Sequence, residues 1–138
     1  MQQYCTFVLD GHLFGIPVEA VQEVLREQAV TPVPLAPPEV CGLANLRGQV
    51  VTVLDLRVRL LLPPRPAEER PVSVVVRTAQ GAPTSLVVDR VGHVIKPDPG
   101  SLEAPPETVD PAIRALVTSV CKLDGELLLV LDTERAVA

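Results

Sequence analysis

The sequence has very few aromatic side chains: one tyrosine, two phenylalanines and no tryptophan among 138 residues. Hydrophobic residues nevertheless make up 47% of the chain, so valine and leucine must fill the core. Valine is β-branched and favours strands. The composition therefore predicts a mainly β fold with a sizeable core, and the length suits one cooperative unit.

Lysine is also scarce. Only Lys96 and Lys122 are present, and neither has a basic neighbour in the sequence. The formal net charge is −5 at pH 7. Because binding to phosphates requires clustered lysine and arginine, the charge pattern predicts no nucleic-acid partner.

Long apolar runs are missing as well. No segment approaches the roughly 18 uninterrupted apolar residues of a membrane-spanning helix. The first residues, Met1-Gln2-Gln3, lack the basic region and the apolar core of a signal peptide. We therefore expect a cytoplasmic protein that does not insert into a membrane.

Cysteine and histidine do not occur in the patterns of disulfide or metal sites. The cysteines, Cys5, Cys41 and Cys121, are odd in number and widely spaced, with no C-x-x-C pair. His12 and His93 have no ligand-type neighbour at the short spacings of known metal sites. We expect no metal and no cofactor.

Catalytic motifs are absent too. The sequence contains no G-x-S-x-G elbow, no Walker loop and no G-x-G-x-x-G fingerprint. Leu131-Asp132-Thr133 is similar to the aspartic protease loop, but Glu134 stands where that loop needs glycine. Cys41 has no obvious histidine partner in the sequence. The sequence therefore predicts a protein that is not an enzyme.

Short β-branched or alternating runs, separated by turn residues, fill most of the chain. Asp10-Gly11 and Asp124-Gly125 are typical hairpin turns. The expected strands are 4–9, 13–16, 49–54, 72–76, 86–88, 113–123 and 127–131. Residues 18–25 fit either a helix or one helical turn that passes into a strand, and residues 133–138 fit either a docked helical turn or a frayed end.

The stretch from Cys41 to Pro64 carries the strongest local signals. Gly42 and Gly48 bracket a short run, which predicts a hairpin, and a strand over 49–54 then leads to Asp55, a good helix cap. One helical turn over 55–61 places Leu56 and Leu60 on one face and leaves Arg57 and Arg59 in solvent. Pro63 and Pro64 end it.

Four apolar runs end in aspartate, at Asp10, Asp55, Asp89 and Asp132. Aspartate at a strand exit forms turns or caps helices through its own side-chain oxygens, so the pattern indicates architecture and two similar halves. The polar, Pro-rich loop 63–71 is the natural boundary between these halves. Another Pro-rich stretch, 31–38, predicts a stiff surface connection, although it also matches the loose P-x-x-P form of SH3 ligands.

The string G-L-A-N-L-R-G-Q-V-V-T-V-L-D-L-R-V-R-L resembles the signature of the CheW family of chemotaxis adaptors. The upstream run F-G-I-P-V-E-A-V-Q-E-V and the downstream run V-V-D-R-V follow in the order and spacing of that family. The resemblance covers nearly the whole chain.

This resemblance implies a mainly β fold of two intertwined five-stranded SH3-like barrels around a shared apolar core, with one or two short helices. It implies one CheW-like domain over 1–138, with subdomains at roughly 12–66 and 70–123 and terminal strands that complete the barrels. It also implies a scaffold that couples the cytoplasmic tip of a chemoreceptor to the regulatory domain of a CheA-type histidine kinase. We expect a monomer when the protein is alone.

The family's binding positions carry over to named residues. The resemblance implies receptor binding at Val18, Val21, Glu23, Val24, Asn45 and Arg47, and kinase binding at Val87, Val91 and Val94. The residues alone leave two interpretations open. Val21 and Val24 are either core residues or an exposed edge with Glu23 between them, and Arg47 either closes a turn or offers donors to a partner.

The sequence departs from the family pattern at several points. Leu61 replaces a glycine after the short helix, Ser85 replaces a glycine before the V-V-D run, and the tail after Leu131 is short. These differences bear on which partner is recognised. The alternative function is a CheW-like protein with a different output, such as motility or development, that binds only one of the two partners.

Overall fold

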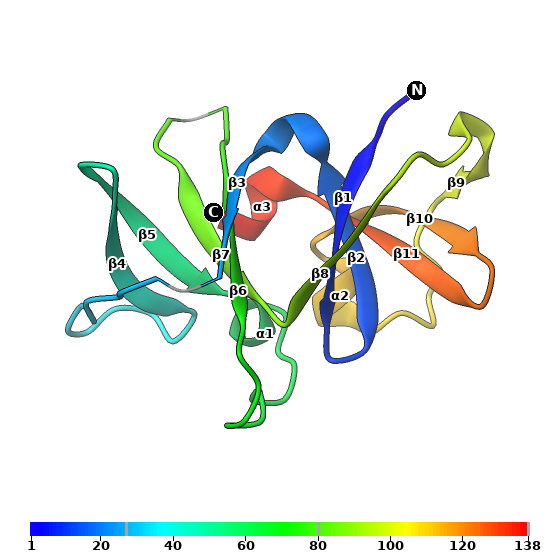
Figure 1. Cartoon of the computed structure of the whole chain (residues 1–138). Coiled ribbons are helices and arrows are strands. Elements are labelled where there is room, and N and C mark those ends of the chain that lie inside the picture. Colours follow the sequence, from blue (N-terminus) through cyan, green and yellow to red (C-terminus); the bar gives the residue numbers. More distant parts are fainter. Residues whose placement is uncertain (27, 80, 138) are drawn as a thin grey trace.

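The computed structural model describes residues 1–26, 28–79 and 81–137. Within these residues the chain is mainly β and contains eleven strands, three short α-helices and two 3-10 turns. The strands form two mixed sheets, which curl into two small barrels that lie side by side (Figure 1). This is the expected fold class.

The first barrel is built on a sheet of five strands, counted over the described residues, in the order β3-β6-β7-β5-β4. Two antiparallel hairpins, β4-β5 and β6-β7, meet at the parallel pair β5-β7. Thr31 and Leu43 exchange two backbone hydrogen bonds of 2.8 Å, so the chain after β3 closes on the free edge of β4. The bounds are β3 (Val21–Leu25), β4 (Val40–Leu46), β5 (Gln49–Asp55), β6 (Val72–Val76) and β7 (Thr84–Val88).

The second barrel repeats this plan with six strands among the described residues, in the order β8-β1-β2-β11-β10-β9. The hairpins β1-β2 and β10-β11 are joined by the parallel pair β2-β11. The bounds are β1 (Tyr4–Leu9), β2 (His12–Pro17), β8 (Arg90–Ile95), β9 (Leu102–Glu103), β10 (Val117–Leu123) and β11 (Glu126–Leu131).

The helices are single turns that begin after aspartates or prolines. They are η1 (Val18–Ala20), α1 (Leu56–Arg59), η2 (Pro99–Ser101), α2 (Pro111–Arg114) and α3 (Thr133–Val137). Asp55 accepts a hydrogen bond of 3.0 Å from the Arg57 backbone N–H and caps α1, as the sequence predicts. Asp110 caps α2 in the same way. The described residues thus hold three short α-helices where one or two were expected.

Two local predictions change at element ends. The strand predicted over 113–123 begins only at Val117, because Asp110 and Pro111 start α2 instead. Residues 18–25 form one 3-10 turn followed by β3, which is the second of the two alternatives. At the other end, α3 is docked, with Ala136 fully buried. Ala138, the last residue of that prediction, lies outside the described residues.

The two sheets divide the chain differently from the expected subdomains, 12–66 and 70–123. Strand β2 lies in the six-stranded sheet, whereas β6 and β7 lie in the five-stranded sheet with β3, β4 and β5. The physical reason is the parallel pairing of β2 with β11, because parallel neighbours need a long crossover connection. The six-stranded sheet therefore combines strands from both ends of the chain, whereas the strands β3 to β7 of the other sheet are consecutive in the sequence.

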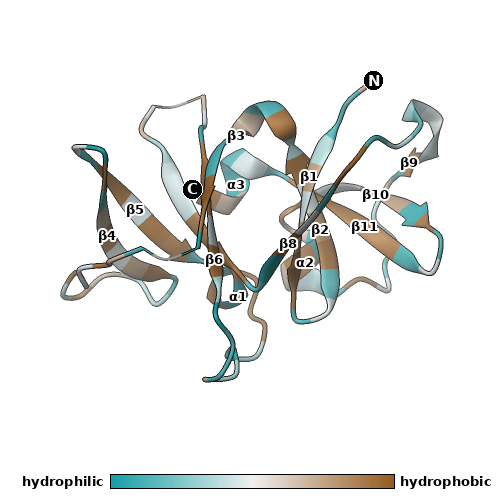
Figure 2. Cartoon of the chain, in the orientation of Figure 1, coloured by the Kyte–Doolittle hydropathy of each residue, from teal (hydrophilic) through white to brown (hydrophobic). Residues whose placement is uncertain are grey.

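One apolar core runs between the barrels. It includes Phe7 and Phe14 of the second barrel, whose rings stack with centroids 6.0 Å apart, and Leu86 of the first barrel. Leu56 and Leu60 of α1 are also fully buried there, on the shared face that the sequence predicts. Figure 2 shows hydrophobic residues along β5 and β11 and hydrophilic residues in the loop that leads into β6. The barrels therefore share burial and depend on each other for stability.

Candidate functional site

The tip of the β4-β5 hairpin presents Arg47 to solvent. Asn45 closes the turn, because its Oδ1 accepts a hydrogen bond of 2.9 Å from the Gly48 backbone N–H. Arg47 has a left-handed backbone, with φ of 52°, and its side chain is 76% exposed. The turn is therefore held by a side chain, and the guanidinium is available on the surface.

Arg47 and Glu23 form an ion pair between the hairpin tip and the edge strand β3. Arg47 Nη1 lies 2.5 Å from Glu23 Oε2, and the Glu23 side chain is only 16% exposed. Exposed ion pairs of this kind typically contribute less than about 1 kcal/mol to stability. The pair therefore orders the surface more than it supports the fold.

An apolar groove lies between β3 of the first barrel and β8 of the second. We call it the interbarrel groove, and its volume is about 450 Å³. Val24 of β3 and Val91 of β8 both line it and are 46% and 40% exposed. The lining residues are Val24, Arg26, Arg70, Pro71, Val72, Arg90 and Val91. The structure thus brings together two valines that the resemblance assigns to different partners.

The other predicted valines lie in different surroundings. Val21 is half-buried and packs against the shared core, so the core interpretation holds for Val21 but not for Val24. Val18 is half-buried in η1. Val87 is half-buried against the core of the first barrel, whereas Val94 on β8 is 56% exposed.

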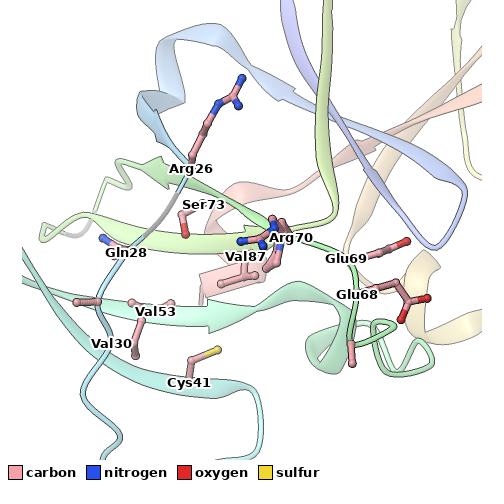
Figure 3. A pocket seen from close by; sticks show the side chains of 13 residues that line it. Arg26, Gln28, Val30, Cys41, Val53, Glu68, Glu69, Arg70, Ser73 and Val87 are labelled. Atoms are coloured by element: carbon pink, nitrogen blue, oxygen red, sulfur yellow. The ribbon is translucent and has the colours of Figure 1, made fainter.

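A second, larger cleft of about 990 Å³ opens beside the first barrel (Figure 3), and we call it the barrel cleft. Val53 and Val87 line it together with Cys41. Figure 3 shows Arg26 extending away from Val53 and Cys41. Arg26, Arg70 and Pro71 line both this cleft and the interbarrel groove, so the end of the 63–71 loop separates the two.

A buried cluster of charges holds that loop. Arg57 donates hydrogen bonds from Nε and Nη2 to the two carboxylate oxygens of Asp89, at 2.8 and 2.5 Å. Its Nη1 donates to the Pro63 carbonyl at 3.0 Å, and Arg65 Nε donates to Asp89 Oδ1 at 2.9 Å. The loop is thus tied at its beginning to α1 and to the end of β7.

Arg57 corrects a prediction from the sequence. The helical spacing placed Arg57 and Arg59 in solvent, but Arg57 is only 4% exposed and Arg59 is half-buried. Arg59 Nη2 donates to the Arg135 carbonyl at 3.1 Å and so contacts α3. Asp89 after β7 and the backbone of α3 cover the arginines of this short helix, and a helical pattern taken alone does not predict these distant contacts.

The surroundings of Asp89 set its pKa. Burial alone would raise the pKa of this carboxyl, but hydrogen bonds from Arg57, from the Asp10 backbone N–H and from Arg65 outweigh burial and lower the pKa to about 2. The hydrogen bond to Asp89 raises the pKa of Arg57 in turn. Both groups therefore carry their charge at neutral pH.

The sequence contains a signal for this cluster, although the pattern by itself indicates only architecture. Three of the four aspartates that end apolar runs, Asp10, Asp55 and Asp89, converge around Arg57 and Arg65. Arg57 Nη1 lies 3.9 Å from Asp10 Oδ1, and Arg65 Nη2 lies 3.5 Å from Asp55 Oδ1. A sequence signal for the cluster would combine these aspartates with the arginines that follow them in the chain, such as Arg57 and Arg65.

The thiols and the residue types that bind metals are the remaining reactive groups. The cysteines are free, and burial raises the pKa of the Cys5 and Cys41 thiols. In the described part of the chain, no three His, Cys, Asp or Glu residues are grouped to hold a metal ion. Over the same residues, no helix has the length and apolarity required to cross a membrane.

Two interlocked SH3-like barrels with a shared core and an exposed groove between them define the class of two-barrel binding modules. The family model described as CheW-like domain matches residues 3–138, and the chain belongs to this family.

Individual proteins agree with this assignment. Chemotaxis protein CheW of Treponema pallidum (strain Nichols) is 27% identical over 136 residues, which cover 96% of this chain and 80% of the relative. Chemotaxis protein CheW of Bacillus subtilis (strain 168) is 28% identical over 131 residues, covering 95% and 83%. The crystal structure of scaffolding protein TtCheW from Thermoanaerobacter tengcongensis has a TM-score of 0.83 and 30% identity, covering 94% of this chain and 88% of that one.

Proposed function

We propose that this protein is a cytoplasmic chemotaxis scaffold without catalytic activity of its own. It binds the cytoplasmic tip of a chemoreceptor and the regulatory domain of a CheA-type histidine kinase, and so couples receptor state to kinase activity. The relatives are named chemotaxis proteins and the similar structure is named a scaffolding protein, which supports this proposal. Two rigidly joined barrels suit a scaffold, because they hold two partners in a fixed relation.

The observation that carries the receptor half of the proposal is the interbarrel groove with its exposed Val24 and Val91. Glu23 precedes Val24 on β3, so its side chain points to the other face of the strand, where the Arg47–Glu23 pair offers a separate polar contact. An apolar groove with oriented polar groups at its border is what a partner helix needs. Val18, Val21 and Asn45 remain proposed receptor contacts.

The kinase half requires a second surface. Val87, Val91 and Val94 are the candidate residues, but Val91 lines the groove together with Val24. One surface does not hold two partners at once, so we assign Val91 to the receptor groove. Val87 in the barrel cleft and Val94 on β8 remain the proposed kinase contacts.

Reconstitution tests the proposal. The purified protein is mixed with a receptor signalling fragment and a CheA-type kinase, and both complex formation and kinase autophosphorylation are measured. We expect a ternary complex and a change in autophosphorylation that depends on the protein. Failure to form any complex, together with unchanged kinase activity, would contradict the scaffold function.

The alternative with one partner and a different output is tested separately. Pull-down of receptor fragment alone and of kinase regulatory domain alone distinguishes the two functions. Binding to both partners supports the chemotaxis scaffold. Binding to only one partner supports the protein with a different output.

A further inference from the structure

The interbarrel groove has a charge pattern that differs from that of the whole chain. Three arginines surround its valines: Arg26 at the end of β3, Arg70 in the 63–71 loop and Arg90 at the start of β8. Among the described residues, no aspartate or glutamate lines the groove. A protein with a formal net charge of −5 thus concentrates positive charge at this one apolar site.

These arginines have no ion-pair partner among the described residues. Arg47, Arg57, Arg65 and Arg135 behave differently, since each of them pairs with a carboxylate of the chain. The nearest acidic residues in sequence to Arg70 are Glu68 and Glu69. They line the barrel cleft instead, and Glu69 lies 3.7 Å from Arg57.

The fold holds two of the three arginines in place. Arg70 belongs to the loop that Arg57 and Arg65 tie to Asp89, and Pro71 stiffens the backbone next to it. Arg90 directly follows Asp89 and pairs with Val8 of β1 through the backbone ladder. Arg70 and Arg90 therefore line the groove from two separate elements, the 63–71 loop and β8, and the hydrogen bonds of Asp89 hold these elements together.

We propose that the interbarrel groove selects a helical partner segment whose apolar stripe is flanked by aspartate or glutamate side chains. The stripe packs on Val24, Val72 and Val91, and the flanking carboxylates pair with Arg70 and Arg90, with Arg26 as a third donor. Unpaired arginines at the border of an apolar site recognise carboxylates and exclude segments flanked by lysine. The inference extends the proposed receptor function by stating the chemistry that the receptor tip presents.

Two designed helical hairpins test the selection without assuming any natural partner. They share one apolar stripe, flanked by glutamates in the first and by lysines in the second. Binding to the full-length protein is followed by NMR at low and at high salt. We expect the glutamate hairpin to bind with shifts at the groove, the lysine hairpin to bind at least tenfold more weakly, and the difference to shrink with salt. Equal binding of the two hairpins, or binding of neither, would overturn the inference.

Reversal of the charges at the groove is the second test. The double variant Arg70→Glu and Arg90→Glu is expected to prefer the lysine hairpin, while each single Arg→Gln change weakens glutamate-hairpin binding by roughly two- to fivefold. Arg114→Glu is the matched control. This exposed arginine lies in α2, outside the groove and the cleft, and has no ion pair with a described residue. If Arg114→Glu changes the preference as much as the double variant does, net charge and not the groove is responsible, and the inference fails.

A receptor signalling fragment separates this inference from the proposed function. If the fragment does not bind the wild-type protein although the glutamate hairpin does, the receptor function fails and the groove chemistry stands. If the fragment binds equally to the wild type and to the double variant, the receptor function stands and the inference fails. Circular dichroism of every variant confirms that each is folded.

Discussion

Arg57 donates two parallel hydrogen bonds to Asp89 beside the junction of the two barrels, of 2.8 Å from Nε and 2.5 Å from Nη2. Arg57 lies in α1, which follows the signature hairpin, and Asp89 lies between the last strand of the first barrel and the edge strand of the second. The planar guanidinium matches the carboxylate in a way that lysine does not. This pair fixes the position of the 63–71 loop, which carries Arg70.

Asp89→Asn should strongly destabilise the protein. The change leaves the buried Arg57 charge without its main counter-ion, and breaking a buried pair from one side typically lowers the free energy of unfolding by roughly 3 kcal/mol. Urea denaturation measures the change. Asp124→Asn, at the exposed β10-β11 turn, is the matched control, and we expect it to stay within about 0.5 kcal/mol of the wild type. Equal stability of the two variants would contradict a structural role for the pair.

Acid should remove the stabilising contribution of ionised Asp89 to the free energy of unfolding. The folded pKa of Asp89, about 2, lies below the value of about 3.9 for an unpaired aspartate. A lowered pKa adds stability that is complete above pH 4 and is lost as the pH falls from about 4 to about 2, amounting to about 2 kcal/mol. Urea denaturation at several pH values should show this loss in the wild type and a shallower slope in Asp89→Asn. Parallel slopes would mean that Asp89 does not titrate as an ion-paired group.

Leu61→Gly should stabilise the protein, because Leu61 adopts a left-handed backbone with φ of 56° and is 79% exposed. Relief of this conformation, which costs a non-glycine residue roughly 1–2 kcal/mol, outweighs the greater freedom of glycine in the unfolded chain. We expect a gain of about 0.5–1 kcal/mol in thermal or urea denaturation. Val58→Gly, three residues earlier in α1, is the control and should lose stability. A loss in both variants would contradict the strain at Leu61.

Gly42→Ala should disrupt the first barrel. A Cβ at Gly42 would meet the Thr31 carbonyl oxygen, the atom that accepts the Leu43 backbone hydrogen bond and closes the barrel. The free energy of unfolding should fall by roughly 2–4 kcal/mol. Gly48→Ala, where φ is +86° but no neighbouring atom lies within 4 Å, is the control and should lose only about 1 kcal/mol. Similar losses at both sites would show that backbone conformation, and not contact, is what matters at Gly42.

The sequence predicted the features that depend on near neighbours. The Asp10-Gly11 turn, the N-L-R-G hairpin and the Asp55 cap each form within a few residues, so local patterns were sufficient. The start of α2 was also a local signal, but the apolar run after Ile113 concealed it. Leu61 shows that a departure from the family pattern marks real strain, because the backbone keeps the conformation that glycine would take freely.

Features that depend on distant pairing were not predictable. Arg57 and Asp89 are 32 residues apart in sequence, and only the fold shows that they meet in a buried seam. Val24 and Val91 face one groove only because β3 and β8 are edge strands of different sheets. The place of the β1-β2 hairpin in the sheet of the C-terminal strands likewise follows from the parallel pairing of β2 with β11, which hydrophobic alternation does not encode.

Loss of the Arg47–Glu23 pair should affect binding and leave the fold intact. Arg47→Ala removes a side chain that is 76% exposed, so the free energy of unfolding should change by less than about 1 kcal/mol. We expect the variant to bind a receptor fragment more weakly, since it loses an exposed donor of the proposed receptor contact. Thermal denaturation and fragment binding are measured on the same sample. An unfolded variant would show that Arg47 is structural.

The most direct test of the proposed receptor-binding surface is NMR of the isotope-labelled protein titrated with a chemoreceptor signalling-tip fragment. We expect the largest chemical shift changes on Val24 and Arg47 of the first barrel and on Val91 of the second, with smaller changes elsewhere. Changes confined to the β10-β11 hairpin on the other side of the second barrel, or no changes at all, would contradict it.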